Sequence, residues 1–491
     1  MPVPGGLTSW HADWKGVKVL VVGLGVTGFS VADTLWELGA DVLVVTRDAS
    51  PEHRAMLDAL GVRYELTPVD SDAVVRAGEF SPDVIVVSPG LNPRHPLIEW
   101  ANSNSVPVWG DIELAWRVRD KVAPAEWILI TGTNGKTTTT QLTAHALRTA
   151  GFRAAAVGNI GVPVLDAIRE PSGFDFLVVE LSSFQLHWLP GVGEGALRPF
   201  ASAVLNVAND HIDWHGSMES YQTAKGVVYF NTRNVVLYNT ADPVTERLVR
   251  DAHVEEGCEA IGFGFKTPDT GELGTVDGIL VDRAFIADRR NTAQEIVTVD
   301  RLSELGFASP HMILNILAAS GLAMSAGASA NAVAEALDTF AVDHHRCETI
   351  TEHDGVRWVD DSKATNGHAA NSSLRTFPSL VWIVGGLFKG TSIDELVQAH
   401  ASRLRAVIVI GEDRSEPLRA LAEWAPSVPV VEVTGDTVMV DAVREAARLA
   451  KAGDTVLLAP AAASMDQFVD YADRGRQFAD AVRALTGMTN G

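Results

Sequence analysis

The sequence predicts an α/β protein of three domains, each built on a largely parallel sheet covered by helices. Strand-length apolar runs alternate with helix-length amphipathic stretches along almost the whole chain, and this alternation is typical of parallel sheets. The 491 residues also exceed what one hydrophobic core usually supports, so several domains of ~100 to 200 residues are expected. We expect a Rossmann-like domain over residues 1–112, a central domain over 113–342 and a second Rossmann-like domain over 343–491.

The first domain begins with the apolar run Val17–Val22, followed by Gly23-Leu-Gly25-Val-Thr-Gly28 and a helix-length stretch. This spacing is typical of a glycine turn that brings a nucleotide's phosphates to a helix N-terminus. The second strand ends Val45-Thr46-Arg47, without the acidic side chain that a nicotinamide cofactor's ribose would require. A phosphate-bearing nucleotide held by the glycines and Arg47 therefore fits better than hydride chemistry.

The central domain carries the strongest local motif, Gly132-Thr-Asn-Gly135-Lys136-Thr137, between an apolar strand and a helix-like stretch. Its two glycines allow the backbone N–H groups to face one phosphate, Lys136 supplies a cation for the β- and γ-phosphates, and the Thr137 hydroxyl can hold Mg²⁺. The motif is a short form of the phosphate loop, because Ile130 stands where its first glycine would be. We predict a P-loop ATPase-like domain that binds and cleaves ATP.

Polar side chains follow other predicted strands. Glu180 ends an apolar run and could supply an anionic ligand to Mg²⁺, while His211 lies in the loop Asn209–Asp213 beside carboxylates. Lys225 is expected on a helix, where a surface cation is the simplest interpretation.

In the third domain, strands at 356–359, 381–384, 406–410, 428–433 and 455–458 also end in polar or glycine-rich segments. Ligands bind outside the carboxyl ends of strands in such sheets, so these segments would form a second wall.

Composition excludes several classes of protein. The formal net charge of −23 disfavours a general nucleic-acid or anionic-membrane surface. Cys258 and Cys347 are the only cysteines and lack metal-ligand spacing, so neither a disulfide framework nor a zinc site is supported. No run reaches the ~18 apolar residues of a membrane span. We expect a cytoplasmic monomer that inserts into no membrane and binds no nucleic acid.

Nine segments, taken in chain order, form a recognisable set: Gly23–Gly28, Ser88-Pro-Gly90, Gly132–Thr137, Gly158-Asn-Ile-Gly161, Glu180-Leu-Ser-Ser-Phe-Gln185, Asp210-His211, His345-Arg346, Asp361-Ser-Lys-Ala-Thr-Asn366 and Ser464-Met-Asp-Gln-Phe468. Together they resemble the Mur ligase family of peptidoglycan synthesis over nearly the whole chain. The likeness is strongest to the members that join D-glutamate to UDP-N-acetylmuramoyl-L-alanine. The chain has no Asp-Asn-Pro-Arg segment, which is associated with the diaminopimelate-adding relative.

The resemblance implies an ATP-dependent acid–amino-acid ligase. Because a carboxylate is a poor electrophile, ATP would phosphorylate the L-alanyl carboxylate to an acyl phosphate, and the amine of D-glutamate would then displace phosphate. Lys136 would stabilise the transferring phosphoryl group, and Thr137, Glu180 and His211 would attend two Mg²⁺ ions. Lys225 matches the family's lysine that reacts with CO₂ to give a carbamate, an anion able to support the second metal site.

The resemblance also implies three sets of binding residues. The ATP set is Gly132, Thr133, Asn134, Gly135, Lys136, Thr137, Thr138, Asn315, Arg346 and Asp361. The UDP-sugar set is Val26, Thr27, Thr46, Arg47, Ser88, Gly90, Asn159 and His211. The D-glutamate set is Lys363, Thr365, Lys389, Ser464 and Tyr471, whose two lysines suit a substrate with two carboxylates.

Three positions depart from the family pattern. Met312 stands where an Asn is expected on the adenine side, Val45 where the family can carry Asp, and Tyr471 where Phe is usual. Two alternatives stay open. The chain could be another amino-acid ligase, either a different Mur ligase or a folylpolyglutamate synthase, although the Gly23–Gly28 domain argues against the folate enzyme. It could also be a nucleotide-binding protein without turnover, although Lys136, Glu180, His211 and Lys225 are all present.

Overall fold

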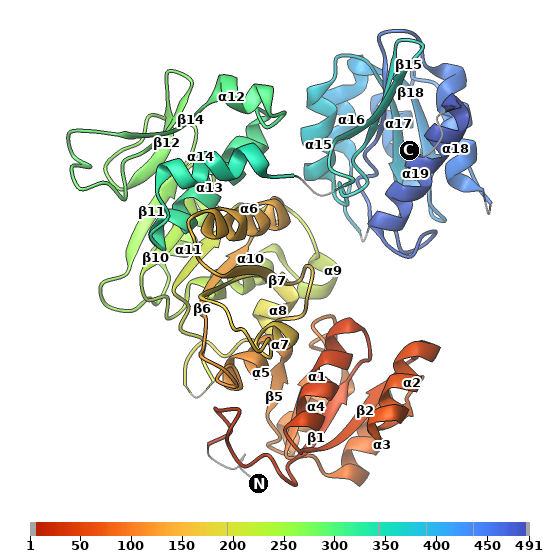
Figure 1. The fold of residues 1–491 in the computed structure, drawn as a ribbon. Coiled ribbons are helices and arrows are strands. Elements are labelled where there is room, and N and C mark those ends of the chain that lie inside the picture. Colours follow the sequence, from red (N-terminus) through yellow and green to blue (C-terminus); the bar gives the residue numbers. More distant parts are fainter. Residues whose placement is uncertain (1–5, 194, 342–343, 389, 436, 488–491) are drawn as a thin grey trace. The chain divides into compact units, whose positions relative to one another are not determined.

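The computed structural model describes residues 6–193, 195–341, 344–388, 390–435 and 437–487. These residues form three sheets flanked by helices, which confirms the predicted α/β class (Figure 1). They divide into two compact units, Met1–Val207 with Glu219–Phe340, and Ala208–Met218 with Ala341–Gly491. The first unit contains two of the sheets and the second unit contains the third.

The first sheet is parallel throughout, with strand order β3-β2-β1-β4-β5. Its strands are β1 (Lys18–Val22), β2 (Asp41–Thr46), β3 (Arg63–Leu66), β4 (Val84–Val87) and β5 (Val108–Gly110), and its helices are α1 (Val26–Glu37), α2 (Pro51–Leu60), α3 (Asp70–Phe80), α4 (Pro96–Ser103) and α5 (Asp111–Arg117). The chain order reverses between β1 and β4, and an open parallel sheet binds its ligand at such a switch point. The glycine turn Gly23–Gly28 lies at this point.

The central sheet has the order β14-β13-β12-β11-β10-β9-β6-β8-β7. Its strands are β6 (Glu126–Thr131), β7 (Ala154–Gly158), β8 (Phe176–Glu180), β9 (Ala201–Val204), β10 (Val235–Asn239), β11 (Glu259–Phe263), β12 (Glu272–Val276), β13 (Ile279–Asp282) and β14 (Gln294–Thr298). Strands β6–β12 pair in parallel, whereas β12, β13 and β14 pair antiparallel as an extension of the sheet. The sequence did not predict this extension.

Helices flank the central sheet. They are α6 (Lys136–Thr149), α7 (Val164–Ala167), α8 (Ser183–His187), α10 (Met218–Gly226), α11 (Pro243–Arg250), α12 (Val299–Glu304), α13 (Pro310–Ser325) and α14 (Ala330–Thr339), with a 3₁₀ turn at Val227–Tyr229. Helix α6 begins directly at the phosphate loop, and both α13 and α14 pack against it. The long helix α13 is apolar and mostly buried, because it lies between α6 and the sheet.

The second unit is built on a sheet of order β15-β16-β20-β17-β18-β19, in which only β15 runs antiparallel among the described strands. Its strands are β15 (Glu348–His353), β16 (Val356–Asp360), β17 (Leu380–Gly385), β18 (Leu404–Ile410), β19 (Val430–Glu432) and β20 (Thr455–Leu458). Its helices are α9 (Ile212–His215), α15 (Gly367–Thr376), α16 (Asp394–His400), α17 (Ser415–Trp424), α18 (Val438–Leu449) and α19 (Tyr471–Thr486), with a 3₁₀ turn at Ala401–Arg403. The five strands predicted in this part of the sequence are all present.

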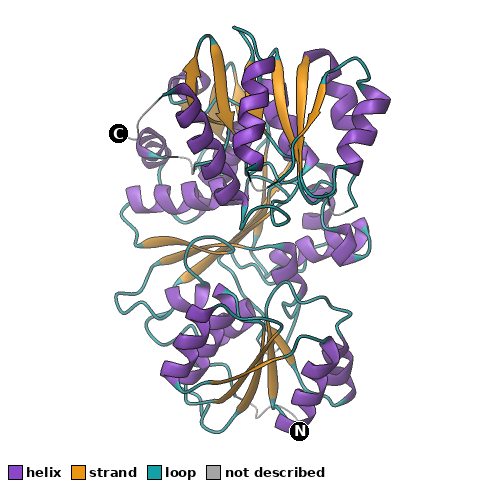
Figure 2. Cartoon of the chain, turned by 90° about the vertical axis from the view of Figure 1, so that its right-hand side faces the viewer, coloured by secondary structure: helices purple, strands orange, loops and turns teal. Residues whose placement is uncertain are grey.

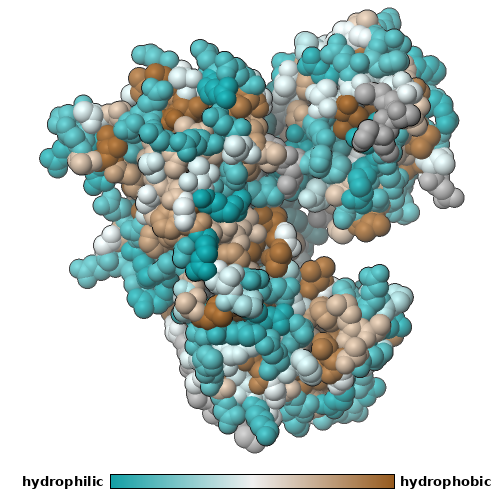
Figure 3. Space-filling view, in the orientation of Figure 1, coloured by the Kyte–Doolittle hydropathy of each residue, from teal (hydrophilic) through white to brown (hydrophobic). Residues whose placement is uncertain are grey.

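Burial of the strands provides the cores of both units. Strands β4, β8, β17 and β20 are buried at every position, which explains their continuous apolar sequences. Helices lie on both sides of the strands (Figure 2), and hydrophobic residues occupy only limited areas of the surface visible in Figure 3. In the described part of the chain, no helix combines the length and the hydropathy needed to cross a membrane.

Hydrogen bonds join the first and central sheets within the first unit. Trp188 Nε1 donates to the carbonyl of Pro89 at 3.3 Å, and Gln185 Nε2 donates to Asp111 Oδ2 at 3.0 Å. Burial raises the pKa of Asp111 to about 6. The segment after β8 is therefore tied to the loop after β4, so that the central sheet is held against the first sheet's ligand edge.

Candidate active site

The phosphate loop connects β6 to α6, and both of its glycines lie in close contact with other parts of the chain. Gly135 has φ +82° and ψ −12°, a left-handed conformation that side chains disfavour, and a Cβ there would lie 2.2 Å from Asn315 Oδ1. A Cβ at Gly132 would lie 3.0 Å from Leu205 Cβ. The backbone of the loop is thus closely packed on two sides, which fixes the direction of its N–H groups.

Asn206, which follows β9, is hydrogen-bonded to the phosphate loop. Its carbonyl accepts from Thr133 N at 2.9 Å, its Oδ1 accepts from Asn134 N at 2.9 Å, and its Nδ2 donates to Asn134 O at 3.1 Å. Asn206 was not among the residues selected from the sequence. A polar residue at the carboxyl end of a buried strand was the signal that could have identified it.

Two lysines converge on the loop. Lys136 Nζ donates to the carbonyls of Gly132 at 3.0 Å and Thr133 at 2.9 Å, and Lys225 Nζ donates to Gly132 O at 2.9 Å. Lys225 is 2% exposed and lies 4.7 Å from the Tyr221 ring centroid. The interpretation of Lys225 as a surface cation is therefore wrong, because its helix α10 packs this side chain beneath the phosphate loop.

Glu180 lies beside the loop because β8 pairs with β6, in a register that sets Glu180 opposite Ile130. Its side chain is 2% exposed, and Oε1 accepts from Asn159 Nδ2 at 3.1 Å. Among the described residues, no hydrogen-bond donor reaches the buried Oε2. An unpaired buried carboxylate oxygen costs free energy unless a cation compensates it, so the residues at this point fit a divalent metal ion.

Helix α13 brings Asn315 against Gly135, and Asn315 is 7% exposed. Thr137 and Thr138 begin α6 and are also buried. The departure Met312 is buried in α13. Within the first unit the structure therefore brings together the loop, Asn315, Glu180, Asn159 and Lys225, all of which the sequence analysis selected.

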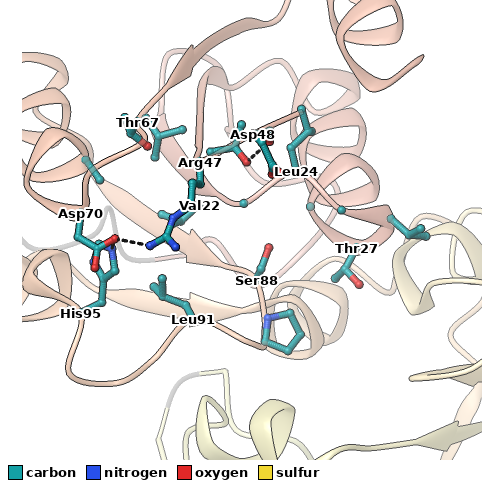
Figure 4. Close-up of a pocket in the computed structure, with 18 residues that line it drawn as sticks. Val22, Leu24, Thr27, Arg47, Asp48, Thr67, Asp70, Ser88, Leu91 and His95 are labelled. Carbon is teal, nitrogen blue, oxygen red and sulfur yellow. Dashed lines mark hydrogen bonds and ion pairs between the residues drawn. The ribbon is translucent and has the colours of Figure 1, made fainter. Parts of the chain in front are cut away.

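A pocket of ≈ 520 Å³ lies at the carboxyl ends of β1, β2 and β4 in the first sheet (Figure 4). Val26, Thr27, Thr46, Arg47 and Ser88 line it, as expected for a UDP-sugar site. Gly90 is not among the described residues that line the pocket, although the adjacent Pro89 and Leu91 are. Asn159 and His211 also lie outside its lining.

Glycines shape this pocket by close contact rather than by turn geometry alone. A Cβ at Gly28 would lie 2.1 Å from the carbonyl oxygen of Gly23, and one at Gly23 would lie 2.4 Å from Ser88 Oγ. The N-terminus of α1 can therefore approach β4 closely, and its first turn lines the pocket. Such a helix N-terminus favours the phosphates of a nucleotide.

His211 belongs to the second unit, whereas the phosphate loop belongs to the first. It has φ +54° and is the N-cap residue of α9, and its backbone N–H donates to Asp210 Oδ1 at 2.9 Å. Asn366 Nδ2 donates to Asp210 Oδ2 at 3.4 Å, and Asn366 Oδ1 caps α15 by accepting from Ala369 N at 2.9 Å. The last residue of the Asp361–Asn366 segment is thereby linked to the His211 loop.

The segment around Asp361 is stabilised by buried polar contacts. Asp361 accepts from the Ser373 hydroxyl and from Cys347 N, and burial raises the pKa of Asp361 to about 7 despite the nearby Arg346. His345, which precedes Arg346, hydrogen-bonds Asp360 Oδ2 through Nδ1 at 2.6 Å. The carboxyl end of β16 therefore positions the two nucleotide candidates from the second unit, Arg346 and Asp361.

Arg474 in α19 connects the amino-acid candidates. Its fully buried guanidinium donates to Ser362 Oγ at 2.9 Å, Ser362 O at 2.8 Å and Ala462 O at 3.1 Å, and burial lowers its pKa to about 10. Lys363 Nζ lies 4.9 Å from the Tyr471 ring centroid, and Ser464 is buried. Arg474 was not identified from the sequence, because a lone arginine on a helix suggests a solvated charge.

The remaining amino-acid candidates are less constrained. Thr365 lies in the same loop as Lys363, and its backbone N–H donates to Lys363 O at 2.9 Å. Lys389 lies outside the described residues. The structure therefore brings Lys363, Ser464 and Tyr471 together around one edge of the third sheet, with Thr365 next to them in sequence.

Comparisons with known proteins agree with this architecture. Residues 17–110 match the Mur ligase MurD-like N-terminal domain, residues 130–323 the Mur ligase middle domain, and residues 345–462 the Mur ligase, glutamate ligase domain. Among solved structures, a UDP-N-acetylmuramate–alanine ligase from Thermotoga maritima has a TM-score of 0.56 at 19% identity, covering 95% of this chain and 99% of that one. A pseudomurein peptide ligase type C from Methanothermus fervidus has a TM-score of 0.57 at 16% identity, with the same coverage.

Curated relatives are much more similar in sequence. The UDP-N-acetylmuramoylalanine–D-glutamate ligase of Leifsonia xyli subsp. xyli is 55% identical over 491 residues, covering 98% of this chain and 95% of that protein. The ligase of the same name from Streptomyces coelicolor is 50% identical, covering 96% and 99%. The solved structures establish the fold, and these relatives establish the family. The chain therefore belongs to the Mur ligase family.

Proposed function

We propose that the chain is an ATP-dependent ligase that joins D-glutamate to UDP-N-acetylmuramoyl-L-alanine and releases ADP and phosphate, in the synthesis of peptidoglycan precursors. The observation that carries this proposal is identity of 50–55% with UDP-N-acetylmuramoylalanine–D-glutamate ligases over nearly the whole chain. The convergence of Lys136, Lys225 and Glu180 on the phosphate loop supports it, since a protein without turnover would not require that arrangement.

The reaction has two steps. In the first, an oxygen of the L-alanyl carboxylate attacks the γ-phosphorus of ATP, and the bond to the β-phosphate oxygen breaks to release ADP. In the second, the amine of D-glutamate attacks the acyl carbon, the tetrahedral intermediate collapses, and phosphate leaves with one oxygen of the original carboxylate. The amine loses its proton, and the protein's main contribution is to hold these charged groups in position.

Lys136 is the cation for the transferring phosphoryl group. Its Nζ is held within the loop by hydrogen bonds that it donates to the carbonyls of Gly132 and Thr133. These neutral acceptors would be exchanged for phosphate oxygens, with which an ammonium forms stronger, charge-assisted hydrogen bonds. Thr133, Asn134, Gly135, Thr137 and Thr138 would supply backbone and hydroxyl groups from the same loop, while Asn315, Arg346 and Asp361 would contact the nucleoside.

Two Mg²⁺ ions would serve this site. Thr137 and Glu180 would hold the first, and the unpaired oxygen of Glu180 supports that assignment. His211 and Lys225 would serve the second, with Lys225 converted to a carbamate by CO₂. The bound ions would neutralise charge on the phosphate oxygens. Conversion of Lys225 also would replace a buried cation by an anion, which suits a metal ligand.

The substrates would occupy the remaining sites. The UDP end of UDP-N-acetylmuramoyl-L-alanine would bind in the pocket of the first sheet, through Val26, Thr27, Thr46, Arg47, Ser88 and Gly90, with Asn159 and His211 toward the muramoyl part. D-glutamate would bind through Lys363, Thr365, Lys389, Ser464 and Tyr471. We assign the domains to residues 1–112, 113–342 and 343–491, and expect a cytoplasmic monomer.

The test is phosphate release from ATP and Mg²⁺ by the purified chain with UDP-N-acetylmuramoyl-L-alanine. D-glutamate would be compared with L-glutamate, L-alanine and diaminopimelate, each with and without Mg²⁺. Release that depends on D-glutamate and on Mg²⁺ supports the proposal. Release with a different amino acid would support the same mechanism but show that D-glutamate is not the substrate. No release in any combination would contradict the proposal.

A further inference from the structure

The first-sheet pocket contains a group of polar side chains that the sequence analysis did not assign. If UDP binds there, as proposed above, its base needs partners for three polar atoms on one edge, because uracil presents an N3–H donor between two carbonyl acceptors. Val45, near the end of β2, is fully buried and offers no polar side-chain atom. A carboxylate from another element that lines the pocket would supply a stronger, charged acceptor for N3–H.

Asp70 is such an acceptor, and two basic side chains lie beside it. It begins α3 and lines the pocket together with Arg47 and His95 (Figure 4). Arg47 Nη2 contacts Asp70 Oδ1 at 2.9 Å, and His95 Nε2 lies 3.4 Å from the same oxygen. No contact from the described residues reaches Asp70 Oδ2, so that oxygen remains able to accept a hydrogen bond.

The cap that His95 forms on α4 sets its Nε2 beside Asp70. His95 caps α4, where Nδ1 accepts from Leu97 N at 3.1 Å. A ring nitrogen that accepts carries no proton, so the proton of the neutral imidazole is on Nε2, the atom that faces Asp70. His95 has only 11% of its side chain exposed. Its Nε2 therefore lies beside Asp70 Oδ1 and leaves Oδ2 uncovered.

We propose that Asp70 is the residue that selects uracil, accepting the N3–H of the base through Oδ2 while the Arg47 guanidinium beside it donates to a neighbouring carbonyl. This inference rests on the proposed binding of a UDP-sugar. The paired donor and acceptor complement uracil and oppose cytosine, whose N3 is an acceptor and whose exocyclic amine is a donor. With cytosine in the pocket, the Asp70 carboxylate would face the N3 acceptor, so its hydrogen bond would be lost and the two groups would repel each other.

The experiment measures the dissociation constants of UDP and CDP by calorimetry, using the full chain and its Asp70→Asn variant. We expect the unmodified chain to prefer UDP by at least about tenfold, because hydrogen bonds to charged groups give discrimination of that order. Asp70→Asn has nearly the same shape but offers an amide that can donate, so it should lose most of this preference by weakening UDP. An unchanged preference in Asp70→Asn would overturn the inference.

Asp41→Asn is a matched control. Asp41 pairs with Arg63 at 2.6 Å on the same sheet, with side-chain exposures of 43% and 59% that resemble the 45% and 72% of Asp70 and Arg47, but it does not line the pocket. Asp41→Asn should retain the preference of the unmodified chain for UDP. If Asp41→Asn lost as much of this preference as Asp70→Asn, the change in net charge would explain the effect, and the inference would be overturned. D-glutamate-dependent phosphate release is measured in parallel. If the unmodified chain releases phosphate but Asp70→Asn keeps the preference for UDP, only the role of Asp70 is refuted. If the unmodified chain releases no phosphate, the proposed function is refuted.

Discussion

Gly135→Ala is the substitution whose effect the structure defines most sharply. It adds a Cβ at φ +82°, and that atom would lie 2.2 Å from Asn315 Oδ1. The change therefore has two separable consequences, backbone strain in the phosphate loop and displacement of a side chain proposed to contact the nucleotide. Gly39 provides a control for the first of these, since it also has φ +82° and no described atom would lie within 4 Å of its Cβ.

The expected magnitudes follow from these contacts. Left-handed strain costs about 1–2 kcal/mol for either alanine, so both variants should lose similar stability. Only Gly135→Ala forces Asn315 away, by about 1 Å or more to restore an ordinary contact. A displacement of about 1 Å at a reacting site can reduce turnover by about 100-fold. We therefore expect kcat/KM for ATP to fall by about 100-fold in Gly135→Ala and to change little in Gly39→Ala.

Steady-state ADP release at saturating UDP-N-acetylmuramoyl-L-alanine and D-glutamate, together with thermal melting, distinguishes these effects. Melting shows whether the two variants are equally destabilised, and the kinetics show whether only one loses activity. Full activity in Gly135→Ala would refute the proposed fit between the loop and Asn315. An equal loss of activity in Gly39→Ala would refute the attribution to the site, because it would trace the loss to instability.

Two further predictions concern the charged groups of the two units. Lys136→Ala should abolish phosphate release while leaving the melting temperature nearly unchanged, since the bonds from Lys136 Nζ to Gly132 O and Thr133 O stay within the loop; unchanged activity would remove the phosphate-loop assignment. Burial raises the pKa of Asp361 from 3.8 to about 7, so its native form retains a proton that the unfolded form loses, and its contribution to stability declines as the pH rises from about 4 to about 7. Asp361→Asn should lack this decline when melting curves are compared across that range, and parallel curves would contradict the assignment.

Most of the fold could be predicted because buried parallel strands have continuous apolar sequences. Thr455–Leu458 was predicted with the bounds that the structure shows, and Leu380–Gly385 extends its prediction by one residue at each end. The antiparallel strands β12–β14 were missed because they carry exposed or half-buried charged residues such as Glu272 and Glu295. The pairing of these strands depends on contacts with other strands of the sheet, and no local sequence pattern predicts it.

The candidate site was predictable where glycine or a strand end constrained the backbone. Gly132, Gly135 and Glu180 could be identified for that reason, but the burial of Lys225 could not, since helix α10 has a polar sequence and the packing beneath the loop is tertiary. Asp70 and His95 were missed for a related reason. Asp70 begins α3 and His95 caps α4, and a polar residue at a helix start is ordinarily explained by capping.

The central claim is that ATP activates the L-alanyl carboxylate as an acyl phosphate before D-glutamate attacks. The most direct measurement uses UDP-N-acetylmuramoyl-L-alanine with both carboxylate oxygens replaced by ¹⁸O and follows the label by mass spectrometry. The account predicts that each turnover transfers one ¹⁸O to inorganic phosphate, and only when D-glutamate is present. Label in AMP, or unlabelled phosphate accompanying product, would contradict it.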